Sequence, residues 1–426
     1  MKLITMVARA VPALVLAFAA SSACADKITL DVQYAQPGFA KFHEPIAQAF
    51  MKANPDIEIK FRTPAKDYDE GHQAMLRATV VNQLPDVYFP GFDLMGELVD
   101  VLVKRGQVLD LGPLLAAEPA AWKSENYSDA MLRLGQVNGK QYGLAVNASL
   151  PIMYFNADLV KKAGGDPAKM PDTWDGVIAL AARIHATTPS AAGMAFDIGV
   201  YPGNWLFQSI LDQAGAAMLN PAGTDIAFDN DIGRKVMVNL HRFVTEGAMS
   251  VLDLEASRQQ FLAGQTGVFF DTPARLRLVT SGVGTRFILG TAAFPIDDKT
   301  HGGIPTGGCA IIVTTKDAAK QKAAWEYAKF ITGPEAQKIV VENTGYLPLN
   351  RRASGPEFLG PFYDKNPNFR TVALQSDRAV PWQGYRGDAV RIWRAQRDII
   401  DKTMRGHTTP EAGLAELVRT TRAMMK

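Results

Sequence analysis

Strand and helix patterns alternate along the segment that follows the N-terminal residues. Ile28, Leu30 and Val32 alternate with polar neighbours, as in a strand, and apolar residues then recur every four positions over 42–50, as on one helix face. This helix is expected to end at 54–56. A strand over 57–61, a helix over 72–81 and a short strand over 85–89 are expected to follow. This order predicts an α/β fold with a largely parallel sheet, whose ligands collect at strand ends.

The rest of the chain predicts a second lobe. Residues 158–280 are richer in helical periodicity, and a strand over 310–313 and a helix over 317–331 follow before Gly333-Pro334. The 426 residues exceed the roughly 250 to 300 at which a single core stops growing. Because no solenoid repeat or low-complexity linker occurs, short crossing segments are expected to join the lobes.

The first 25 residues have the layout of a secretory signal peptide. Two basic residues precede an apolar run over 11–20, which is shorter than the about 20 residues of a spanning helix, and Ala23-Cys24-Ala25 follows. Lipidation of Cys24 stays open, but Ser21 stands where lipoprotein signals usually carry an aliphatic residue, so we favour cleavage after Ala25 and a periplasmic location. Cys309 then has no partner for an internal disulfide, and a packed core must hold the fold.

Charge and motif content exclude several function classes. Cleavage would leave 43 of the 45 Lys and Arg residues, equal to the 43 Asp and Glu residues, which argues against nucleic acid or an anionic membrane as partner. The six histidines are scattered, with no pair at metal-binding spacing. Phosphate-cradling loops, dinucleotide fingerprints and nucleophile elbows are also lacking, so neither a cofactor nor a metal is expected.

Six segments in a fixed order resemble landmarks of the bacterial extracellular solute-binding proteins of the maltose-binding and glycerol-phosphate-binding kind. Each is simple in composition, but their order and spacing over most of the chain are specific. The segments are FHEPIAQAFMKANPDIEIKF (42–61), PDVYF (85–89), NGKQYGLAVNASLPIMYFN (138–156), FLAGQTGVFF (261–270), AAWEYAKFITGPEAQ (323–337) and TGYLPLN (344–350).

The resemblance implies a two-lobed periplasmic-binding-protein fold of type II, with a hinge of crossing segments and the ligand between the lobes. The first lobe would comprise residues 26–147 and 296–345, and the second 148–295 and 346–426. Crossings are expected near Asn147, Ala292 to Pro295 and Tyr346. The implied function is capture of a carbohydrate or an anionic, phosphorylated polyol, acting as a monomer, for the membrane permease of an ABC importer. Hinge closure would mark the loaded state.

Aromatic and basic residues are the first candidates for the ligand site. Trp205 follows a turn where related binders place a stacking tryptophan, although it could equally cap the core of the second lobe. Trp382 and Arg386 lie in a glycine-flanked segment, and Arg386 matches a substrate-contacting arginine of the glycerol-phosphate binders. A guanidinium suits phosphate or carboxylate oxygens, and the alternative for Arg386 is a salt bridge between helices.

Small and hydroxyl residues complete the implied site. Gly307 and Gly308 match a glycine pair whose N–H groups reach the ligand, although glycines can also mark a strand that needs close packing. Ser149 and Tyr346 match contact positions at the first and third crossings, and Tyr68 is a looser match. For each of these three side chains, the alternative is an ordinary turn or core residue.

Four residues depart from the glycerol-phosphate pattern. Phe92 and Asp93 stand where those proteins place a glutamate, and Asp271 and Thr272 stand where they place small hydroxyl residues. Glycerol phosphate itself is therefore a doubtful ligand. An extra aromatic face at Phe92 and carboxylates that accept hydroxyl protons at Asp93 and Asp271 favour a larger, more hydroxylated ligand.

Two other function classes stay open. An exported glycoside hydrolase needs two carboxylates at a set separation, and pairs such as Asp297-Asp298 occur by chance among 43 acids. That pair is expected to form a solvated turn instead. A surface-interaction protein that retains the two-lobed fold is the third class, and it would lack a closable polar cleft.

Overall fold

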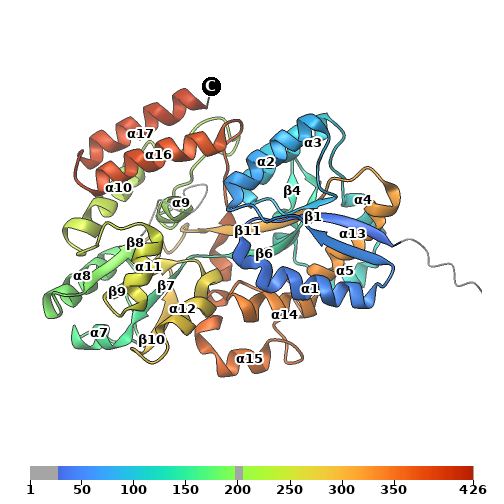
Figure 1. Cartoon of the computed structure of the whole chain (residues 1–426). Helices are drawn as coiled ribbons and strands as arrows, with labels where there is room; N and C mark the ends of the chain where they lie inside the picture. The colour runs from blue at the N-terminus through green and yellow to red at the C-terminus, as the bar shows by residue number, and fades with distance from the viewer. Residues whose placement is uncertain (1–26, 197–204, 426) are drawn as a thin grey trace, which may run out of the picture.

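The computed structural model describes residues 27–196 and 205–425. The predicted signal peptide, Cys24 and the turn before Trp205 lie outside these residues. Two lobes lie side by side, the first on the right of Figure 1 with β1 and α1, and the second on the left with β7 to β10. Within the described residues no helix is long and apolar enough to cross a membrane.

The first lobe is built on a six-stranded sheet with the order β12-β11-β3-β1-β2, in which β6 also pairs with β11. Its strands are β1 (Ile28–Gln33), β2 (Ile57–Phe61), β3 (Val87–Tyr88), β6 (Gly143–Ser149), β11 (Ile304–Val313) and β12 (Ala379–Pro381). The helices of this half are η1 (Pro37–Phe39), α1 (Ala40–Ala53), α2 (Tyr68–Val81), α3 (Phe92–Lys104), α4 (Gly112–Ala117), α5 (Ala120–Asn126), α6 (Asp129–Arg133), α13 (Ala318–Ile331) and α14 (Pro334–Asn343), and the small ribbon β4 (Gln136–Val137) and β5 (Lys140–Gln141) joins them.

The second lobe is built on a four-stranded sheet with the order β10-β7-β9-β8. Its strands are β7 (Ile152–Asn156), β8 (Ala192–Phe196), β9 (Thr266–Asp271) and β10 (Leu289–Ala293). The helices of this half are α7 (Ala157–Lys162), α8 (Trp174–Thr187), α9 (Trp205–Asp212), α10 (Asp231–Thr245), α11 (Leu254–Leu262), η3 (Pro273–Arg275), α12 (Leu276–Val283), α15 (Gly360–Lys365), η4 (Pro367–Arg370), η5 (Ala373–Arg378), α16 (Ala389–Met404) and α17 (Pro410–Met424).

The expected local elements are present, but the sheets are mixed rather than largely parallel. β1 pairs in parallel with β2 and β3, as the alternation of strands and helices predicts. However, β11 runs antiparallel to β3 and β6, and β7 runs antiparallel to β9 and β10. The chain reaches β11 from the second lobe and not through a helical crossover within the first sheet. Such a crossover would make the strand parallel to its neighbour, so β11 can pair antiparallel.

Each lobe has an aromatic core on its sheet. In the first lobe Phe50 of α1 packs against Tyr327 of α13, with ring centroids 5.1 Å apart. In the second lobe the buried Trp174 ring packs against Phe243 and Phe270, each at 4.9 Å. Each core fixes the position of the sheet in its own lobe.

Crossing segments lie side by side between the lobes. Ser149 at the end of β6 pairs with Gly307 of β11, and the neighbouring Ala148 forms a bridge with Leu347. Leu349 N–H donates to Gln337 Oε1 of α14 at 2.9 Å, so the chain just after Tyr346 contacts the first lobe. We retain the lobe limits given above as a proposal.

Candidate functional site

A central cavity lies where the crossing segments meet, with about 400 Å³ of empty volume. Eight of the twelve predicted site residues line it, although they span more than three hundred positions of the sequence. Its lining comprises Gln36, Tyr68, Ser149, Trp205, Thr272, Ala274, Arg275, Gly307, Gly308, Tyr346 and Trp382. The two lobes and the crossing strand β11 therefore contribute to one site.

The glycine pair of β11 forms a closely packed wall of this cavity. A Cβ atom at Gly308, which has φ +126°, would lie 2.2 Å from the Asn147 carbonyl oxygen. A Cβ atom at Gly307 would lie 3.0 Å from the Trp205 ring. Close packing thus accounts for both glycines, and the same lack of side chains leaves their backbone accessible to the cavity.

Two hydroxyl groups join the first crossing to the second lobe. Ser149 Oγ and Thr272 Oγ1 lie 2.7 Å apart, and the Tyr154 hydroxyl donates to the Thr272 carbonyl oxygen at 2.7 Å. Thr272 Oγ1 also accepts from the Ala274 N–H at 3.1 Å. Because Thr272 is held by three groups, it presents a fixed polar edge to a ligand.

Aromatic rings line much of the remaining wall. Trp205 is 3% exposed, and its ring N–H donates to the Pro305 carbonyl oxygen at 2.9 Å. The Trp205 and Trp382 ring centroids lie 6.3 Å apart, with a tilt of 51°. Both rings border the cavity and are also well packed, and contact between Trp205 and a ligand stays a prediction.

Tyr68 contributes a buried hydroxyl whose polar neighbour is the Cys309 thiol, a weak hydrogen-bonding group. Burial raises the pKa of the Tyr68 hydroxyl well above its usual value, so the group stays protonated. A buried, protonated hydroxyl with only a weak partner costs free energy unless a water or a ligand satisfies it better. Tyr68 is therefore suited to donate to a ligand atom in the cavity.

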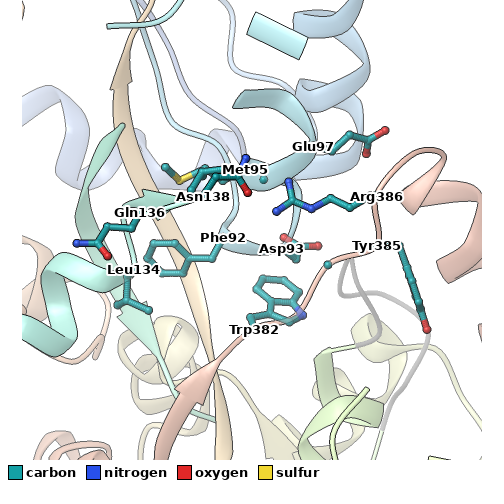
Figure 2. Close-up of a pocket in the computed structure, with 13 residues that line it drawn as sticks. Phe92, Asp93, Met95, Glu97, Leu134, Gln136, Asn138, Trp382, Tyr385 and Arg386 are labelled. Carbon is teal, nitrogen blue, oxygen red and sulfur yellow. The ribbon is translucent and has the colours of Figure 1, made fainter. Parts of the chain in front are cut away.

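A second cavity, with about 540 Å³ of empty volume, adjoins the first at Trp382. Figure 2 shows Trp382 and Arg386 reaching from the C-terminal segment toward the start of α3, where Phe92 and Asp93 lie. Tyr385 accepts a hydrogen bond from Gln396 of α16 at 2.7 Å, which fixes this segment to the second lobe. The second cavity thus also lies between groups from both lobes.

Asp93 lies at the start of α3 and lines the second cavity, and its contact with a ligand stays a prediction. Neither of its carboxyl oxygens has a well-formed hydrogen bond within the described residues, and the side chain is buried. Burial and the nearby Asp69 raise the pKa of Asp93 well above its usual value, outweighing the helix-start N–H groups of Asp93 and Leu94 that lower it. The raised pKa favours the protonated carboxyl group, which can donate a hydrogen bond to a ligand as well as accept one.

Arg386 forms the salt bridge that was the alternative to ligand contact. Its Nη1 lies 2.7 Å from Asp100 Oδ2 of α3, and the two side chains are 49% and 35% exposed. The guanidinium packs closely on Gly96, where a Cβ atom would lie 2.6 Å from Nη1. Arg386 lines the second cavity and not the central one, and its role as a ligand contact remains a prediction.

Asp271 lies behind the central cavity and lines neither cavity. Its carboxylate is fully buried, lies 3.1 Å from Arg258 Nη2, and accepts from the Thr272 N–H at 2.7 Å. Both contacts engage the Asp271 carboxylate, and they help to fix the end of β9 and the following Thr272. A hydroxyl-accepting role for Asp271 would require this ion pair to rearrange.

Sequence reasoning missed Gln36, Ala274 and Arg275, which also line the central cavity. Gln36 has φ 67°, a conformation that glycine and asparagine favour, and no sequence pattern marks it. Arg275 follows the strand β9 after Thr272-Pro273, in the short helix η3. A basic residue just beyond a strand end was the available signal for Arg275.

The carboxylate pair considered for a hydrolase lies elsewhere. Asp298 accepts from the N–H groups of Thr300 and His301 at 2.8 and 2.9 Å, as in a turn, and Asp297 Oδ1 accepts from the Trp174 N–H at 3.1 Å. Neither aspartate lines either cavity. Among residues 27–196 and 205–425, no group of three or more side chains is arranged to hold a metal ion.

Two lobes, side-by-side crossing segments and an interlobe cavity of aromatic and hydroxyl groups define a two-lobed solute-binding protein. A family profile described as bacterial extracellular solute-binding protein matches residues 35–338. The chain belongs to this family, which is one of solute-binding proteins and not of enzymes.

Curated relatives are similar over most of their length. The sn-glycerol-3-phosphate-binding periplasmic protein UgpB of Agrobacterium fabrum is 24% identical over 323 residues, covering 71% of each chain. UgpB of Escherichia coli is 24% identical over 399 residues, covering 87% of this chain and 86% of the relative.

Solved structures share the fold over nearly the whole chain. UgpB from Mycobacterium tuberculosis in complex with glycerophosphocholine superposes with a TM-score of 0.79 at 17% identity, covering 93% of this chain and 98% of that one. The cyclic alpha-maltosyl-1,6-maltose binding protein from Arthrobacter globiformis gives a TM-score of 0.77 at 20% identity, covering 94% and 99%. At these identities the likeness establishes the fold alone.

Proposed function

We propose that this protein is the periplasmic binding component of an ABC importer. It captures a carbohydrate or an anionic polyol between its lobes and delivers it to the membrane permease. The relatives of known name bind sn-glycerol 3-phosphate, glycerophosphocholine or a maltosyl sugar, each of which carries two or more hydroxyl groups. Export by residues 1–25, action as a monomer and the absence of catalysis are parts of the same proposal.

The observation that carries the proposal is the composition of the central cavity. Trp205, Trp382 and Tyr346 supply apolar faces for C–H surfaces, while Ser149 and Tyr68 supply hydroxyl groups. Such a wall suits a hydroxylated ligand, because stacking of half of an aromatic surface of about 200 Å² contributes roughly 2 to 3 kcal/mol. A micromolar complex needs about 8 kcal/mol in all.

We assign the ligand contacts in two groups. The eight predicted residues of the central cavity form the first group, and Phe92 and Asp93 form the second at the adjoining cavity, where Arg386 acts through its ion pair with Asp100. Asp271 supports the first group through its hydrogen bond to Thr272.

Mass spectrometry of ligand that co-purifies with the protein, followed by isothermal titration with sugars, sugar acids and glycerol 3-phosphate, tests the proposal. We expect one of these compounds to bind unchanged and to raise the melting temperature through mass action. Small-angle scattering should then show compaction of the two lobes. Appearance of a reaction product over time would instead favour the hydrolase, and a screen with no binding and no compaction would favour the surface-interaction protein.

A further inference from the structure

The Arg275 guanidinium stands out among the polar groups of the central cavity. The side chain is half-buried, and none of the ion pairs or side-chain hydrogen bonds of the described residues involves it. Its Nη1 lies 3.6 Å from where a Cβ atom of Gly38 would be, so it reaches from η3 in the second lobe to η1 in the first. A partly desolvated cation without a counter-charge is costly, and such groups are commonly satisfied by a ligand.

Lys41 lies close enough to Arg275 and Arg277 to feel their charges, although neither Lys41 nor Arg277 lines the cavity. Lys41 of α1 has no hydrogen bond or ion pair among the described residues. Burial lowers the pKa of Lys41, and the charges of Arg275 and Arg277 lower it further. Arg277 itself contacts uncharged groups, since its Nε donates to the Glu342 carbonyl oxygen at 2.8 Å and its guanidinium lies over the Phe369 ring at 5.1 Å. The three cations thus repel one another, and none of them forms an ion pair with a carboxylate among the described residues.

Other charged groups near the site are already engaged. Asp271 is paired with Arg258 at 3.1 Å, and Arg386 is paired with Asp100 at 2.7 Å on the far side of Trp382. The unneutralised charge of the central cavity is therefore positive, and it lies at the Arg275 edge. The ring of Tyr346 and the hydroxyl groups of Ser149 and Thr272 line the same cavity.

We propose that the ligand is a polyol carrying one oxyanion group, a carboxylate or a phosphate ester, and that Arg275 binds this group while the aromatic rings hold the polyol body. This inference rests on the proposed function and narrows its ligand class. It places the anion at Arg275 rather than at Arg386. A guanidinium binds carboxylate and phosphate oxygens through two parallel N–H donors, a geometry that lysine lacks.

Isothermal titration of the mature chain with paired probes tests the inference. The acidic probes are glycerol 3-phosphate, glucose 6-phosphate and glucuronate, and the neutral counterparts are glycerol and glucose. We expect at least one acidic probe to bind more tightly than its neutral counterpart, with an affinity that falls as salt rises. Comparison of the two phosphate esters with glucuronate shows whether the site prefers a phosphate ester or a carboxylate.

Three variants assign the effect to Arg275. Arg275→Gln should weaken the acidic probe roughly 10- to 100-fold, the range for a hydrogen bond to a charged group, and leave the neutral probe unchanged. Arg275→Lys keeps the charge and should lie between. Arg419→Gln is the matched control, because Arg419 is exposed on α17 and lines neither cavity, and it should change nothing.

The outcomes separate the two proposals. Equal weakening of acidic and neutral probes by Arg275→Gln, or tighter binding of the neutral probes to the wild-type chain, overturns the anion site and leaves the binding function intact. Failure of every probe and of the wider sugar panel overturns the binding function and this inference with it. If Arg275→Gln does not give a cooperative melting transition, Arg275→Lys decides, since full affinity for the acidic probe would contradict the bidentate contact.

Discussion

The salt bridge between Arg386 and Asp100 joins the two lobes at the second cavity. Arg386 belongs to the segment that leads into α16, and Asp100 lies on α3 of the first lobe. Its 2.7 Å distance indicates a direct contact, but exposures of 49% and 35% allow water and salt to screen it. Exposed pairs of this kind contribute about 0.2 to 1 kcal/mol.

We therefore expect Arg386→Gln and Asp100→Asn each to weaken ligand binding by less than about sixfold, because each removes one contact that favours closure. The double variant should resemble either single variant, since both changes break the same pair. Titration calorimetry on the co-purifying ligand, at low and at high salt, measures this cycle. The effect should shrink at high salt.

A direct contact between Arg386 and an anionic ligand would give a different pattern. Loss of that contact would cost about 2 kcal/mol or more, which is roughly 30-fold in affinity. Asp100→Asn would then tighten binding, because it frees the guanidinium from a competing carboxylate. A large loss for Arg386→Gln together with a gain for Asp100→Asn would refute the interlobe role argued here.

Three further changes test other parts of the structure. Trp205→Ala should lower the free energy of unfolding by about 3 to 5 kcal/mol in urea titrations and weaken the ligand in calorimetry, because the ring is 3% exposed and also borders the cavity, while Trp205→Phe retains part of both. Gly308→Ala should lower the free energy of unfolding by about 2 kcal/mol more than Gly223→Ala in urea titrations, because both glycines have positive φ but only Gly308 faces a carbonyl oxygen at 2.2 Å. Burial raises the pKa of Asp212 from 3.8 to about 8, so the contribution of Asp212 to stability is complete below about pH 4 and is lost as the pH rises toward 8. Asp212→Asn should remove this contribution, so the wild-type chain should lose more stability than the variant in unfolding midpoints measured from about pH 4 to 8.

Local sequence patterns predicted the elements well where side-chain periodicity decides the conformation. The helix expected around 42–50 is α1, whose buried residues form one face of the helix. It ends at Asn54, as expected. Strand direction was less predictable. β11 joins the first sheet after its chain crosses from the second lobe, so its antiparallel pairing depends on the hinge path and not on its own residues.

The family resemblance predicted positions of which eight line the central cavity. The charge and hydrogen bonding of a side chain were harder to predict, because they depend on neighbouring residues that the fold brings together. Tyr68 and Tyr346 meet in one cavity although 278 positions separate them, a proximity that only the fold produces. The raised pKa of Asp93 follows from burial and from Asp69, which lies on a different helix. Sequence reasoning missed Arg275, because what distinguishes this residue is that no carboxylate of the described residues forms an ion pair with it. Sequence spacing does not reveal such a property.

Charge at the two edges of the cleft suggests how a ligand would favour closure. Lys41 lies on the first lobe, while Arg275 and Arg277 lie on the second, so bringing these edges together increases repulsion unless an anion lies between them. The Arg386–Asp100 pair acts in the opposite sense at the second cavity. A ligand shifts a conformational equilibrium only through its difference in affinity for the two states. An oxyanion at Arg275 would supply that difference, because it neutralises a repulsion that exists only when the lobes are close. A neutral polyol of the same shape would gain the stacking but not this term, and should therefore compact the protein less at equal saturation.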